Sequence, residues 1–530
     1  MMPVKIPLEV DVLVVGAGPA GLAAAITLGR YGVDTLLVEQ RVEPSFLPRA
    51  TGLSTRTMEL VRTWGLEHEV LAGGVEADVL LWECETLSQV AAGRPHEVGY
   101  PTRQQAAVVS PCAPGVVPQD WLERVLRRHI DSLPTVRLEL GTRVVAVDEA
   151  VGAVQVTLHD PHGHRQTIRA RYLVAADGAH SPIRRMLGVE MREWDGAYGG
   201  TQVLFRAPLA RLLGGVRYAL YAVTTAAAPG LFLPAGRGDR WIYGPAEVDH
   251  PPDLDATHLT EQIRIGAGFA ELQPRIERIA PFRSPGQLAV RFRAGRTFLV
   301  GDAAHRVTPR GGTGLNTALQ SGYDLGWKLS WALRGWAPPE LLDTYEVERR
   351  VVAEHNIVRS TDPQGSRRPV LDELSVDLGG RLRHAWLPAE SGRVSTLDLL
   401  GPGWTLFTGP SGDGWTSAAP SAAAPVTIRA LDAMTARTIG VHGDGALLAR
   451  PDGVPSALWT SAAGAADLRG TVASAWCTSS ATSCARTRPS TSPRPVAALV
   501  NRAGSRSGCS TSTDGSSSPE PPDGGTGWPT

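Results

Sequence analysis

The strongest constraint on the fold of this chain is a glycine motif that separates an apolar segment from an alanine-rich segment near the N-terminus. Residues 11–15 (DVLVV) have the pattern of a short buried strand, and residues 19–31 have that of a helix. Residues 35–39 (TLLVE) repeat the strand pattern after a short connection. Because a β-α-β unit with short connections favours a parallel sheet, we predict an α/β fold.

Three glycines, Gly16, Gly18 and Gly21, form a GxGxxG motif between the first strand and the helix. In a nucleotide-binding turn the first glycine permits the tight turn, the second lets the backbone approach a pyrophosphate, and the third lets helix and strand pack closely. Glu39 ends the second strand, where a carboxylate can accept hydrogen bonds from both ribose hydroxyls and disfavours a 2′-phosphate. This unit predicts a dinucleotide other than NADP and leaves NAD and FAD open.

A second glycine-rich segment, residues 296–316 (RTFLVGDAAHRVTPRGGTGLN), also leads from an expected strand into an expected helix. Its acid, Asp302, comes directly after the strand, where it suits a polyol hydroxyl such as ribitol better than a pyrophosphate. Gly314, Leu315 and Asn316 open the helix, and N–H groups there can face the electron-poor pyrimidine edge of a flavin. One FAD molecule held at both ends explains the two segments most simply.

Three motifs in this order resemble those of the class A flavoprotein monooxygenases, the group of p-hydroxybenzoate and phenol hydroxylases. They are the GxGxxG motif, a DG pair in residues 175–188 (AADGAHSPIRRMLG), and a GD pair followed by P…G-L-N in the second glycine-rich segment. Residues 48–66 (PRATGLSTRTMELVRTWGL) and 117–126 (VPQDWLERVL) also resemble segments of this family. Residues 324–350 (DLGWKLSWALRGWAPPELLDTYEVERR) are typical of its bacterial branch, which hydroxylates aromatic polyketides in antibiotic pathways.

The resemblance implies specific cofactor contacts, including an arginine near the flavin and a glutamine on the cofactor. In this sequence the implied FAD-binding residues are Gly16, Gly18, Gly21, Glu39, Arg49, Gln119, Asp177, Gly178, Gly301, Asp302, Pro309, Gly314, Leu315 and Asn316. The flavin itself carries the chemistry, so the resemblance implies neither a catalytic side chain nor a metal site. Tyr218 and Tyr221 are candidate substrate contacts, whereas we interpret His305 as a structural hydrogen-bonding residue.

The resemblance also implies a domain arrangement. We expect a Rossmann-like FAD-binding domain, an inserted antiparallel-sheet substrate domain and a C-terminal thioredoxin-like domain that lacks a CxxC motif. The expected boundaries are 1–189 and 289–368 for the FAD-binding domain, 190–288 for the substrate domain, 369–475 for the thioredoxin-like domain and 476–530 for a tail. The tail is rich in Ser, Thr, Pro, Gly and Arg, so we expect disorder and hypothesise a shifted reading frame.

The activity implied by the resemblance is hydroxylation of an aromatic, polyketide-derived substrate. NADPH or NADH reduces FAD and leaves, O2 adds to flavin C4a, and the resulting hydroperoxide delivers an OH⁺ equivalent to an electron-rich ring. Other interpretations stay open. They are a drug-inactivating hydroxylase of the same class, a flavin reductase resembling geranylgeranyl reductase, and a non-catalytic flavin binder. A flavin-dependent halogenase is disfavoured because the sequence has no WxWxIP-like segment.

Composition excludes several other classes of partner. The formal net charge is −1, which gives no electrostatic reason to bind nucleic acid or an anionic membrane. No apolar run approaches about 18 residues, and the N-terminus has no signal-peptide pattern, so we expect a cytoplasmic location. The five cysteines show no spacing typical of a zinc site or disulfide scaffold. We expect a monomer or a homodimer.

Overall fold

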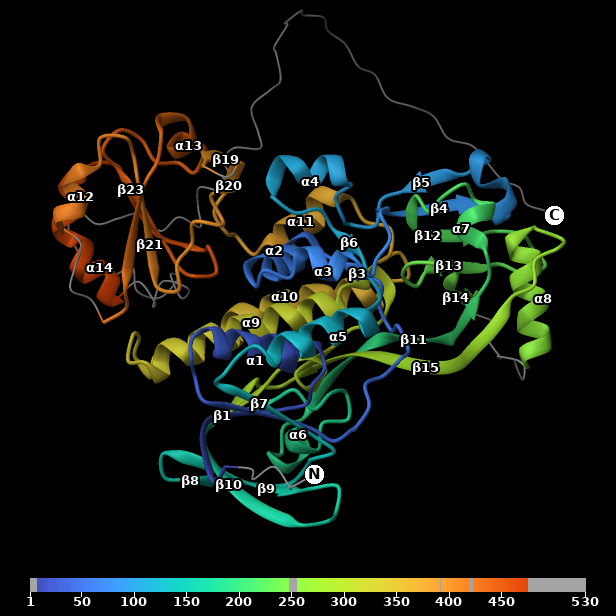
Figure 1. Ribbon diagram of the computed structural model, residues 1–530, viewed down its shortest axis with the longest axis horizontal. Helices are drawn as coiled ribbons and strands as arrows, with labels where there is room; N and C mark the ends of the chain where they lie inside the picture. Colours follow the sequence, from blue (N-terminus) through green and yellow to red (C-terminus); the bar gives the residue numbers. More distant parts are fainter. Residues whose placement is uncertain (1–6, 247–254, 391, 419–422, 475–530) are drawn as a thin grey trace, which may run out of the picture.

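The computed structural model describes residues 7–246, 255–390, 392–418 and 423–474 (Figure 1). Its N-terminal region is built on a sheet in which five parallel strands follow the order β17-β10-β1-β2-β7. The strands are β1 (Glu9–Val15), β2 (Thr35–Glu39), β7 (Val136–Leu140), β10 (Arg165–Ala175) and β17 (Thr297–Leu299). β16 (Arg293–Ala294) and the hairpin of β8 (Arg143–Ala150) and β9 (Ala153–His159) extend this sheet. The predicted β-α-β unit is confirmed.

Two helices far apart in sequence pack directly on each other beside this sheet. They are α1 (Pro19–Arg30) and α9 (Gly314–Leu333). A methyl group added to Gly322 of α9 would lie 2.2 Å from the carbonyl oxygen of Ala20, and one added to Gly326 would lie 2.7 Å from Cβ of Thr27. Only glycine permits this approach. Two further helices of this region are α5 (Gln119–Ile130) and α10 (Asp343–Thr361), the latter preceded by a 3-10 turn, η4 (Pro339–Leu342).

The second region is an eight-stranded sheet in the order β18-β15-β11-β14-β13-β12-β4-β5. Its strands are β4 (Asp78–Cys84), β5 (Arg94–His96), β11 (Met191–Arg206), β12 (Tyr218–Val223), β13 (Gly230–Pro234), β14 (Arg240–Pro245), β15 (Arg275–Ala289) and β18 (His305–Arg306). The antiparallel sheet predicted for residues 190–288 is present, but it is not confined to that range. β4 pairs in parallel with β12, so residues expected in the first domain complete this sheet.

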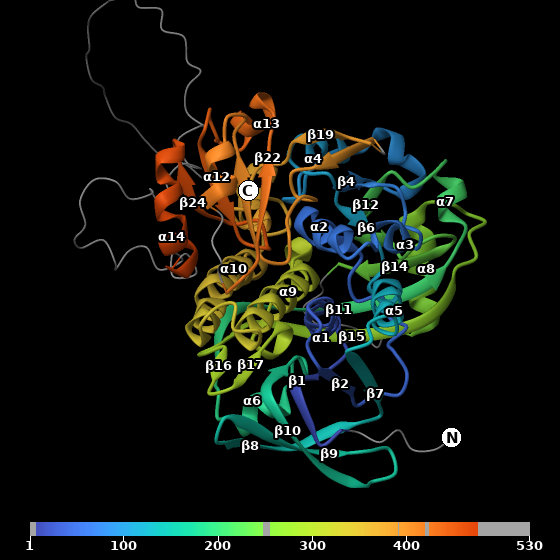
Figure 2. The ribbon, with the colours of Figure 1, turned by 60° about the vertical axis from the view of Figure 1, so that its left-hand side comes forward.

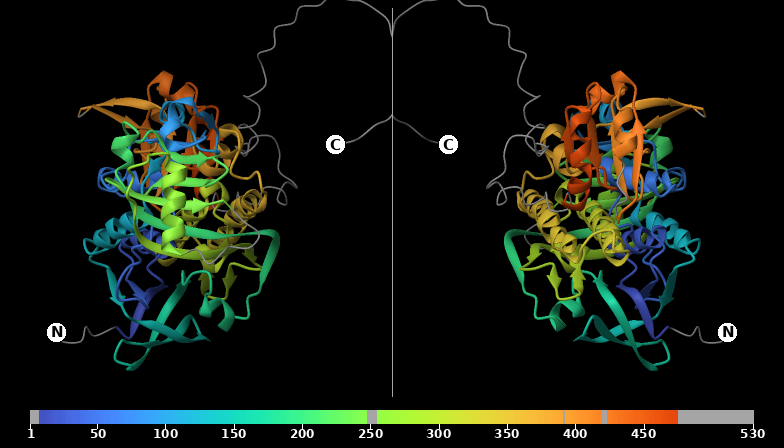
Figure 3. Two further views of the ribbon diagram at one scale, coloured as in Figure 1. Left: turned by 90° about the vertical axis from the view of Figure 1, so that its right-hand side faces the viewer. Right: turned by 90° about the vertical axis from the view of Figure 1, so that its left-hand side faces the viewer.

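The C-terminal region is a four-stranded sheet in the order β22-β21-β23-β24, in which β21 and β22 are parallel. It comprises α11 (Val370–Leu378), β21 (Trp404–Thr408), β22 (Val426–Ala430), β23 (Ala446–Ala449) and β24 (Pro455–Trp459). Figures 2 and 3 show this region and the parallel sheet on opposite sides of α9 and α10. Trp331 of α9 packs against Trp404, with ring centroids 5.1 Å apart. The predicted tail, residues 476–530, lies outside the described residues.

Short elements connect these regions. They are β3 (Gly52–Leu53), α2 (Thr55–Thr63), α3 (Glu67–Leu71), η1 (Leu87–Ala92), α4 (Arg103–Val109), β6 (Gly115–Val116), α6 (Pro182–Met186), α7 (Leu209–Leu212), α8 (Ala256–Ala267), η2 (Gly301–Ala303), η3 (Arg310–Gly312), β19 (Trp386–Ala389), β20 (Gly392–Ser395), α12 (Asp413–Ala418), α13 (Ala433–Thr438), η5 (Ala462–Asp467) and α14 (Leu468–Ser474). Within the described part of the chain, every helix is too short or too polar to cross a membrane.

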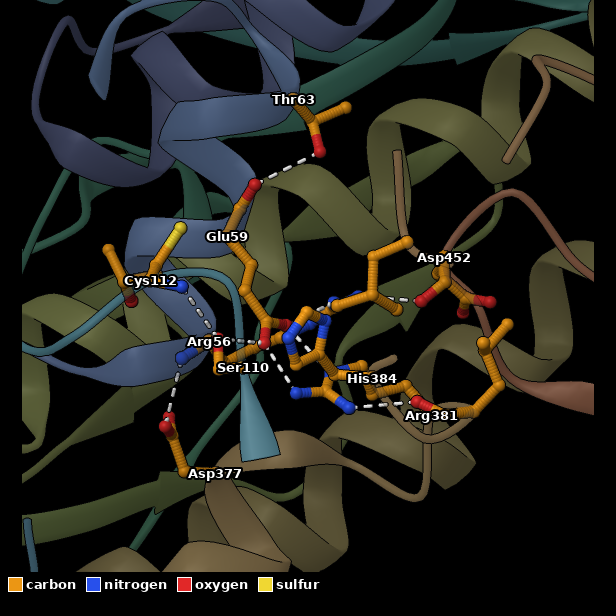
Figure 4. Close-up of polar contacts among 12 residues, drawn as sticks. Arg56, Glu59, Thr63, Ser110, Cys112, Asp377, Arg381, His384 and Asp452 are labelled. Carbon is orange, nitrogen blue, oxygen red and sulfur yellow. Dashed lines mark hydrogen bonds and ion pairs between the residues drawn. The ribbon is translucent and has the colours of Figure 1, made fainter. Parts of the chain in front are cut away.

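A buried ion-pair cluster joins α2 to the chain that follows α11 (Figure 4). The carboxylate of Glu59, which is 3% exposed, accepts hydrogen bonds from Nε of Arg381 at 2.8 Å, Nη1 of Arg56 at 3.0 Å and Oγ of Ser110 at 2.7 Å. Burial raises the pKa of this carboxyl, but the guanidinium groups of Arg381 and Arg56 outweigh burial and hold the pKa below its ordinary value. Glu59 is therefore ionised at neutral pH, and the cluster fixes the C-terminal region to α2.

The substitution Glu59→Gln should cost about 3 kcal/mol of folding free energy, because it leaves two buried guanidinium groups without a counter-charge. Urea unfolding followed by tryptophan fluorescence measures this cost. Because the folded-state pKa is lowered, the advantage of the wild type is complete above the ordinary glutamate pKa of about 4.3 and declines as the pH falls below it. Glu69→Gln, which removes an exposed pair with Arg128, should cost less than about 1 kcal/mol. Equal costs for the two variants would contradict the stabilising role of the cluster.

Candidate functional site

The first glycine motif forms a tight turn between β1 and α1. Gly16 has a φ of +102°, and a methyl group added to it would lie 2.3 Å from the carbonyl oxygen of Ala176. A methyl group on Gly21 would lie 1.9 Å from the carbonyl oxygen of Gly16. Gly18 differs, because an added methyl group there would meet no atom within 4 Å. The turn therefore keeps open space in front of Gly18, at the N-terminus of a twelve-residue helix, where an anion is stabilised.

Glu39 anchors its carboxylate on this turn. Its Oε2 accepts a hydrogen bond from the backbone N–H of Ala17 at 2.8 Å, and its Oε1 accepts one from the N–H of Arg41 at 2.9 Å. An ionised carboxylate has about four lone-pair positions, so acceptor capacity remains for two hydroxyl groups. The parallel register that pairs Val15 with Val38 brings Glu39 to this place.

One face of α5 adds polar side chains that the sequence analysis did not single out. Gln119, which it did predict, donates from Nε2 to Oε1 of Glu123 at 2.7 Å. Arg127 donates from Nη2 to the carbonyl oxygen of Ala17 at 3.2 Å, and its buried Nε has no partner among the described residues. Residues 119, 123 and 127 are spaced four apart, and this spacing in the sequence indicates that their side chains share one face of the helix. The orphan nitrogen beside the glycine turn fits a polar ligand.

The second glycine segment lies directly against the first. Gly301 follows β17 with a φ of +62°, and a methyl group added to it would lie 2.8 Å from Cβ of Ala20 in the first turn of α1. The next residue, Asp302, keeps an exposed side chain, although surrounding protein raises the pKa of its carboxyl. This combination is expected of a side chain that points into a recess. The two motifs, about 280 residues apart in sequence, therefore meet at one place.

Arg49 interacts electrostatically with two acids, Glu123 and Asp302. Burial raises the pKa of Glu123, and the charges of Arg127 and Arg49 lower it while that of Glu39 raises it further. Arg49 also lowers the pKa of Asp302, against the effect of burial. Arg49 is therefore near enough to Glu123 and Asp302, and Glu39 near enough to Glu123, for their charges to interact.

The DG pair supports the second segment through a neighbouring arginine. Asp177 accepts hydrogen bonds from Oγ of Ser181 at 2.6 Å and from the N–H of Ile183 at 3.0 Å, which fixes the start of α6. Arg184 on that helix donates from Nη1 to the carbonyl oxygen of Ala303 at 3.2 Å. Gly178 has a φ of +83° with open space beside it. The DG pair is thus placed next to the GD turn.

The side chain of Asn316 forms hydrogen bonds within the protein that the sequence analysis, which concerned the N–H groups of this turn, did not predict. Its Oδ1 accepts a hydrogen bond from the N–H of Ser54 at 2.8 Å, and its Nδ2 donates to the carbonyl oxygens of Gly52 and Gly312, each at 3.1 Å. The side chain therefore ties β3 to α9. What Gly314, Leu315 and Asn316 can offer to a ligand is the set of backbone N–H groups at the first turn of the helix. Pro309 is exposed beside them.

His305 has the structural role that the sequence suggested. It is 2% exposed, and its Nε2 lies 3.2 Å from Oγ of Ser321. Burial lowers the pKa of His305 to about 3, helped by the charge of Arg349. The imidazole is therefore neutral and a weak base at physiological pH.

The structure does not support Tyr218 and Tyr221 as substrate contacts. Tyr221 is 1% exposed in a cluster with residues of α8, and its hydroxyl accepts hydrogen bonds from the N–H groups of Arg217 and Tyr218 at 3.1 and 3.3 Å. Tyr218 stacks on Trp82 with ring centroids 4.2 Å apart, beside the same cluster. Regular alternation would put residues 218 and 221 on opposite faces, but the irregularity between Tyr218 and Leu220 brings both tyrosines to the face covered by α8.

The opposite face of this sheet turns toward the cofactor-binding segments. Leu220, Ala222 and Leu231 are half-buried and pack against a cluster that includes Val116 of β6. Farther along, Leu233 contacts a cluster with Leu47. Gln202 of β11 donates from Nε2 to the carbonyl oxygen of Pro48 at 2.8 Å, next to Arg49. We call Leu220, Ala222, Leu231 and Leu233 the inner sheet face; it is aliphatic and carries no acid or base.

Known families match this arrangement over most of the chain. Residues 9–360 match the FAD binding domain family, and residues 375–479 match the C-terminal domain family of aromatic-ring hydroxylases. The chain is 33% identical to tetracenomycin A2 monooxygenase-dioxygenase of Streptomyces glaucescens, with 84% of this chain and 92% of that protein covered. It is 32% identical to an aklavinone 12-hydroxylase of Streptomyces purpurascens, with 87% and 96% covered.

A solved structure adds the cofactor. The ternary complex of aklavinone-11 hydroxylase with FAD and aklavinone superimposes with a TM-score of 0.79 at 28% identity, covering 89% of this chain and all of that one. The FAD-domain match spans well over half of the chain, and the glycine turn and the GD turn meet at one place, as binding of one FAD molecule requires. The chain therefore belongs to the FAD-binding aromatic-ring hydroxylases and is an FAD-dependent aromatic monooxygenase.

Proposed function

We propose that this chain hydroxylates a flat, polycyclic, polyketide-derived aromatic compound with NADPH or NADH and O2. One oxygen atom enters the ring as a hydroxyl group, and the other leaves as water with the two electrons of the nicotinamide. The observation that carries the proposal is the inner sheet face, a broad aliphatic surface beside the cofactor-binding segments. Relatives named for tetracenomycin and aklavinone support this substrate class.

The proposed position of FAD extends from Glu39 past the first glycine turn to Asp302. Glu39 binds the ribose of the adenosine half, and the open space at Gly18 receives the pyrophosphate at the start of α1. Arg127 and Gln119 lie on the same side of the turn. Asp302 binds the ribitol, and the first N–H groups of α9 face the pyrimidine edge. FAD supplies the oxygen chemistry, while the protein orients the cofactor and stabilises negative charge on the ring.

The inner sheet face supplies binding and water exclusion rather than proton transfer. Leu220, Ala222, Leu231 and Leu233 present only carbon to a bound ring. Burial of a planar aromatic against such a surface releases water and stabilises the complex by about 25 cal/mol per Å² of apolar area. A dry pocket also protects a reactive oxygen species from decay. Shape and apolar contact therefore select the substrate.

We also infer that the C-terminal region is thioredoxin-like without a redox role. The strand β21 leads through α12 to the parallel strand β22, and the antiparallel pair β23–β24 follows. This order, β22-β21-β23-β24, supports the inference. The sequence has no CxxC motif, so the region has no dithiol centre.

The proposed function is tested with purified protein. We expect a yellow protein whose NADPH or NADH consumption accelerates when an anthraquinone-like polyketide is added, with a product heavier by one oxygen atom in mass spectrometry. A panel of such compounds, assayed also with ¹⁸O2, identifies the substrate class and the oxygen source. A colourless protein would exclude the proposal. A yellow protein without aromatic-stimulated hydroxylation would favour the flavin reductase or a non-catalytic binder.

The substitution Gly18→Ala should weaken FAD binding at least tenfold without destabilising the protein. The added methyl group meets no protein atom, and the φ of −81° at this position is open to alanine, but the methyl group occupies the space assigned to the pyrophosphate. Titration of apoprotein with FAD measures the affinity, and thermal unfolding of the apoprotein measures stability. Gly470→Ala, where an added methyl group would likewise meet no atom within 4 Å, should leave FAD affinity unchanged. An unchanged affinity in Gly18→Ala would place the pyrophosphate elsewhere.

The two faces of the middle sheet should respond differently to substitution. Leu231→Ala removes aliphatic surface from the inner sheet face and should raise KM for the aromatic substrate about fivefold, with FAD affinity unchanged. Tyr221→Phe removes a hydroxyl from the face covered by α8 and should lower stability while leaving KM unchanged. Steady-state kinetics and thermal unfolding measure both. A raised KM in Tyr221→Phe alone would restore the original prediction for that tyrosine.

A further inference from the structure

The turn before α9 has an unusual backbone that needs support from outside. Gly311 and Gly312 have φ values of +78° and +63°, so two consecutive residues adopt the left-handed conformation that favours glycine. Within the turn, the N–H of Gly312 donates to the carbonyl oxygen of Pro309 at 3.1 Å. The carbonyl oxygen of Gly312 points away from that bond and accepts hydrogen bonds from other parts of the chain.

Tyr100 supplies the shorter of these hydrogen bonds. Its hydroxyl donates to the carbonyl oxygen of Gly312 at 2.8 Å and accepts from Nδ2 of Asn316 at 3.2 Å. Nδ2 of Asn316 also donates to the same carbonyl oxygen, so the three groups form a closed cycle. Burial raises the pKa of Tyr100, so its hydroxyl is protonated and remains a donor at physiological pH.

A cavity behind the turn makes this polar contact more important. Its volume is about 30 Å³, and Tyr100, Thr313 and Asn316 line it on the side of the turn. Glu373 and Asp377 of α11 line it on the other side. The buried Oγ1 of Thr313 has no hydrogen-bond partner among the described residues. Because packing is incomplete there, the cycle of Tyr100, Asn316 and the Gly312 carbonyl carries the positioning of the turn.

The ring of Tyr100 connects this cycle to the middle sheet. It is 6% exposed and packs in a cluster with Val79, Leu81 and Ala219. The inner-face residues Leu220, Ala222 and Leu231 pack against the same cluster. One side chain therefore touches both the support of the inner sheet face and the backbone of the turn.

We propose that Tyr100 is a positioning residue for the flavin: through the carbonyl of Gly312 it holds the turn so that the first N–H groups of α9 face the pyrimidine edge. This inference rests on the FAD position proposed above. Reduction places negative charge on that edge, and N–H groups at a helix N-terminus stabilise it. A displaced turn therefore weakens the binding of reduced FAD more than that of oxidised FAD.

The test is the substitution Tyr100→Phe in the FAD-loaded protein and its apoprotein. We expect about fivefold weaker binding of oxidised FAD in a titration of apoprotein. We also expect a shift of the FAD midpoint potential to more negative values, equivalent to about threefold further weakening for the reduced form. The ring stays in its cluster, and Nδ2 of Asn316 keeps two backbone acceptors, so the variant should fold.

The matched control is Tyr323→Phe. The hydroxyl of Tyr323 is also buried and donates to a backbone carbonyl, that of Pro451 at 3.1 Å, but it lies farther along α9 and faces the C-terminal region. Its loss should lower thermal stability about as much as the loss of the Tyr100 hydroxyl, with FAD affinity and midpoint potential unchanged.

The outcomes separate the two proposals. If Tyr100→Phe matches both the wild type and Tyr323→Phe in FAD affinity and midpoint potential, the positioning role is wrong, while the proposed hydroxylase function stands on the wild type. If both variants shift FAD binding equally, the effect is general destabilisation and the positioning role is likewise wrong. If the wild type binds no FAD, both proposals fail together.

Discussion

The close contact between α1 and α9 is the constraint on which the site depends. The two helices lie about 300 residues apart in sequence, yet Gly322 and Gly326 let α9 approach the backbone and side chains of α1 to a distance that no larger residue permits. At the same end, Gly301 lies against Ala20. This contact brings the starts of both helices, where backbone N–H groups have no partner within the helix, close together, as the proposed FAD position requires. The relative position of the two glycine turns therefore depends on this contact between α1 and α9.

The same helix anchors the C-terminal region through charge. Nζ of Lys328, which is fully buried, donates to Asp324 and Glu348 at 2.8 Å each, and Arg450 of the C-terminal region donates to Glu348 at 2.7 Å. Asp324, Glu348 and Asp452 lie close enough to hold a cation, but Lys328 and Arg450 already balance much of their charge. A buried set of this kind fixes geometry more than it adds stability. α9 therefore positions the cofactor turn at its start and the C-terminal region along its length.

Local patterns predicted the elements of the site, because the residues that define them are neighbours in sequence. The bounds of β2, the glycine turn and the position of Glu39 follow from a strand, three glycines and an acid within about 30 residues. The face of Tyr221 did not follow, because a shift of one residue reverses every side chain of a strand. A register shift between Tyr218 and Leu220 in the pairing with β4 makes the direction of these side chains still harder to predict from the sequence.

Long-range contacts explain the remaining differences. The expectation that Asn316 lies at the cofactor stays a prediction. The hydrogen bonds of its side chain with Ser54 and Gly52 were not predicted, because partners 262 and 264 residues away cannot be read from a helix pattern. The sequence analysis missed Glu123 and Arg127 because the sequence of α5 does not show that Arg127 contacts Ala17, about 110 residues away.

The C-terminal region reaches the cofactor site through α11. Asp377 on this helix accepts hydrogen bonds from the N–H of Arg56 at 3.0 Å and from Nε2 of Gln320 at 2.9 Å. Arg56 lies in the first turn of α2 and Gln320 lies on α9, so one carboxylate holds α2 to α9, next to the place where Asn316 ties β3 to α9. The region is therefore a structural part of the site although its sheet lies on the far side of α9.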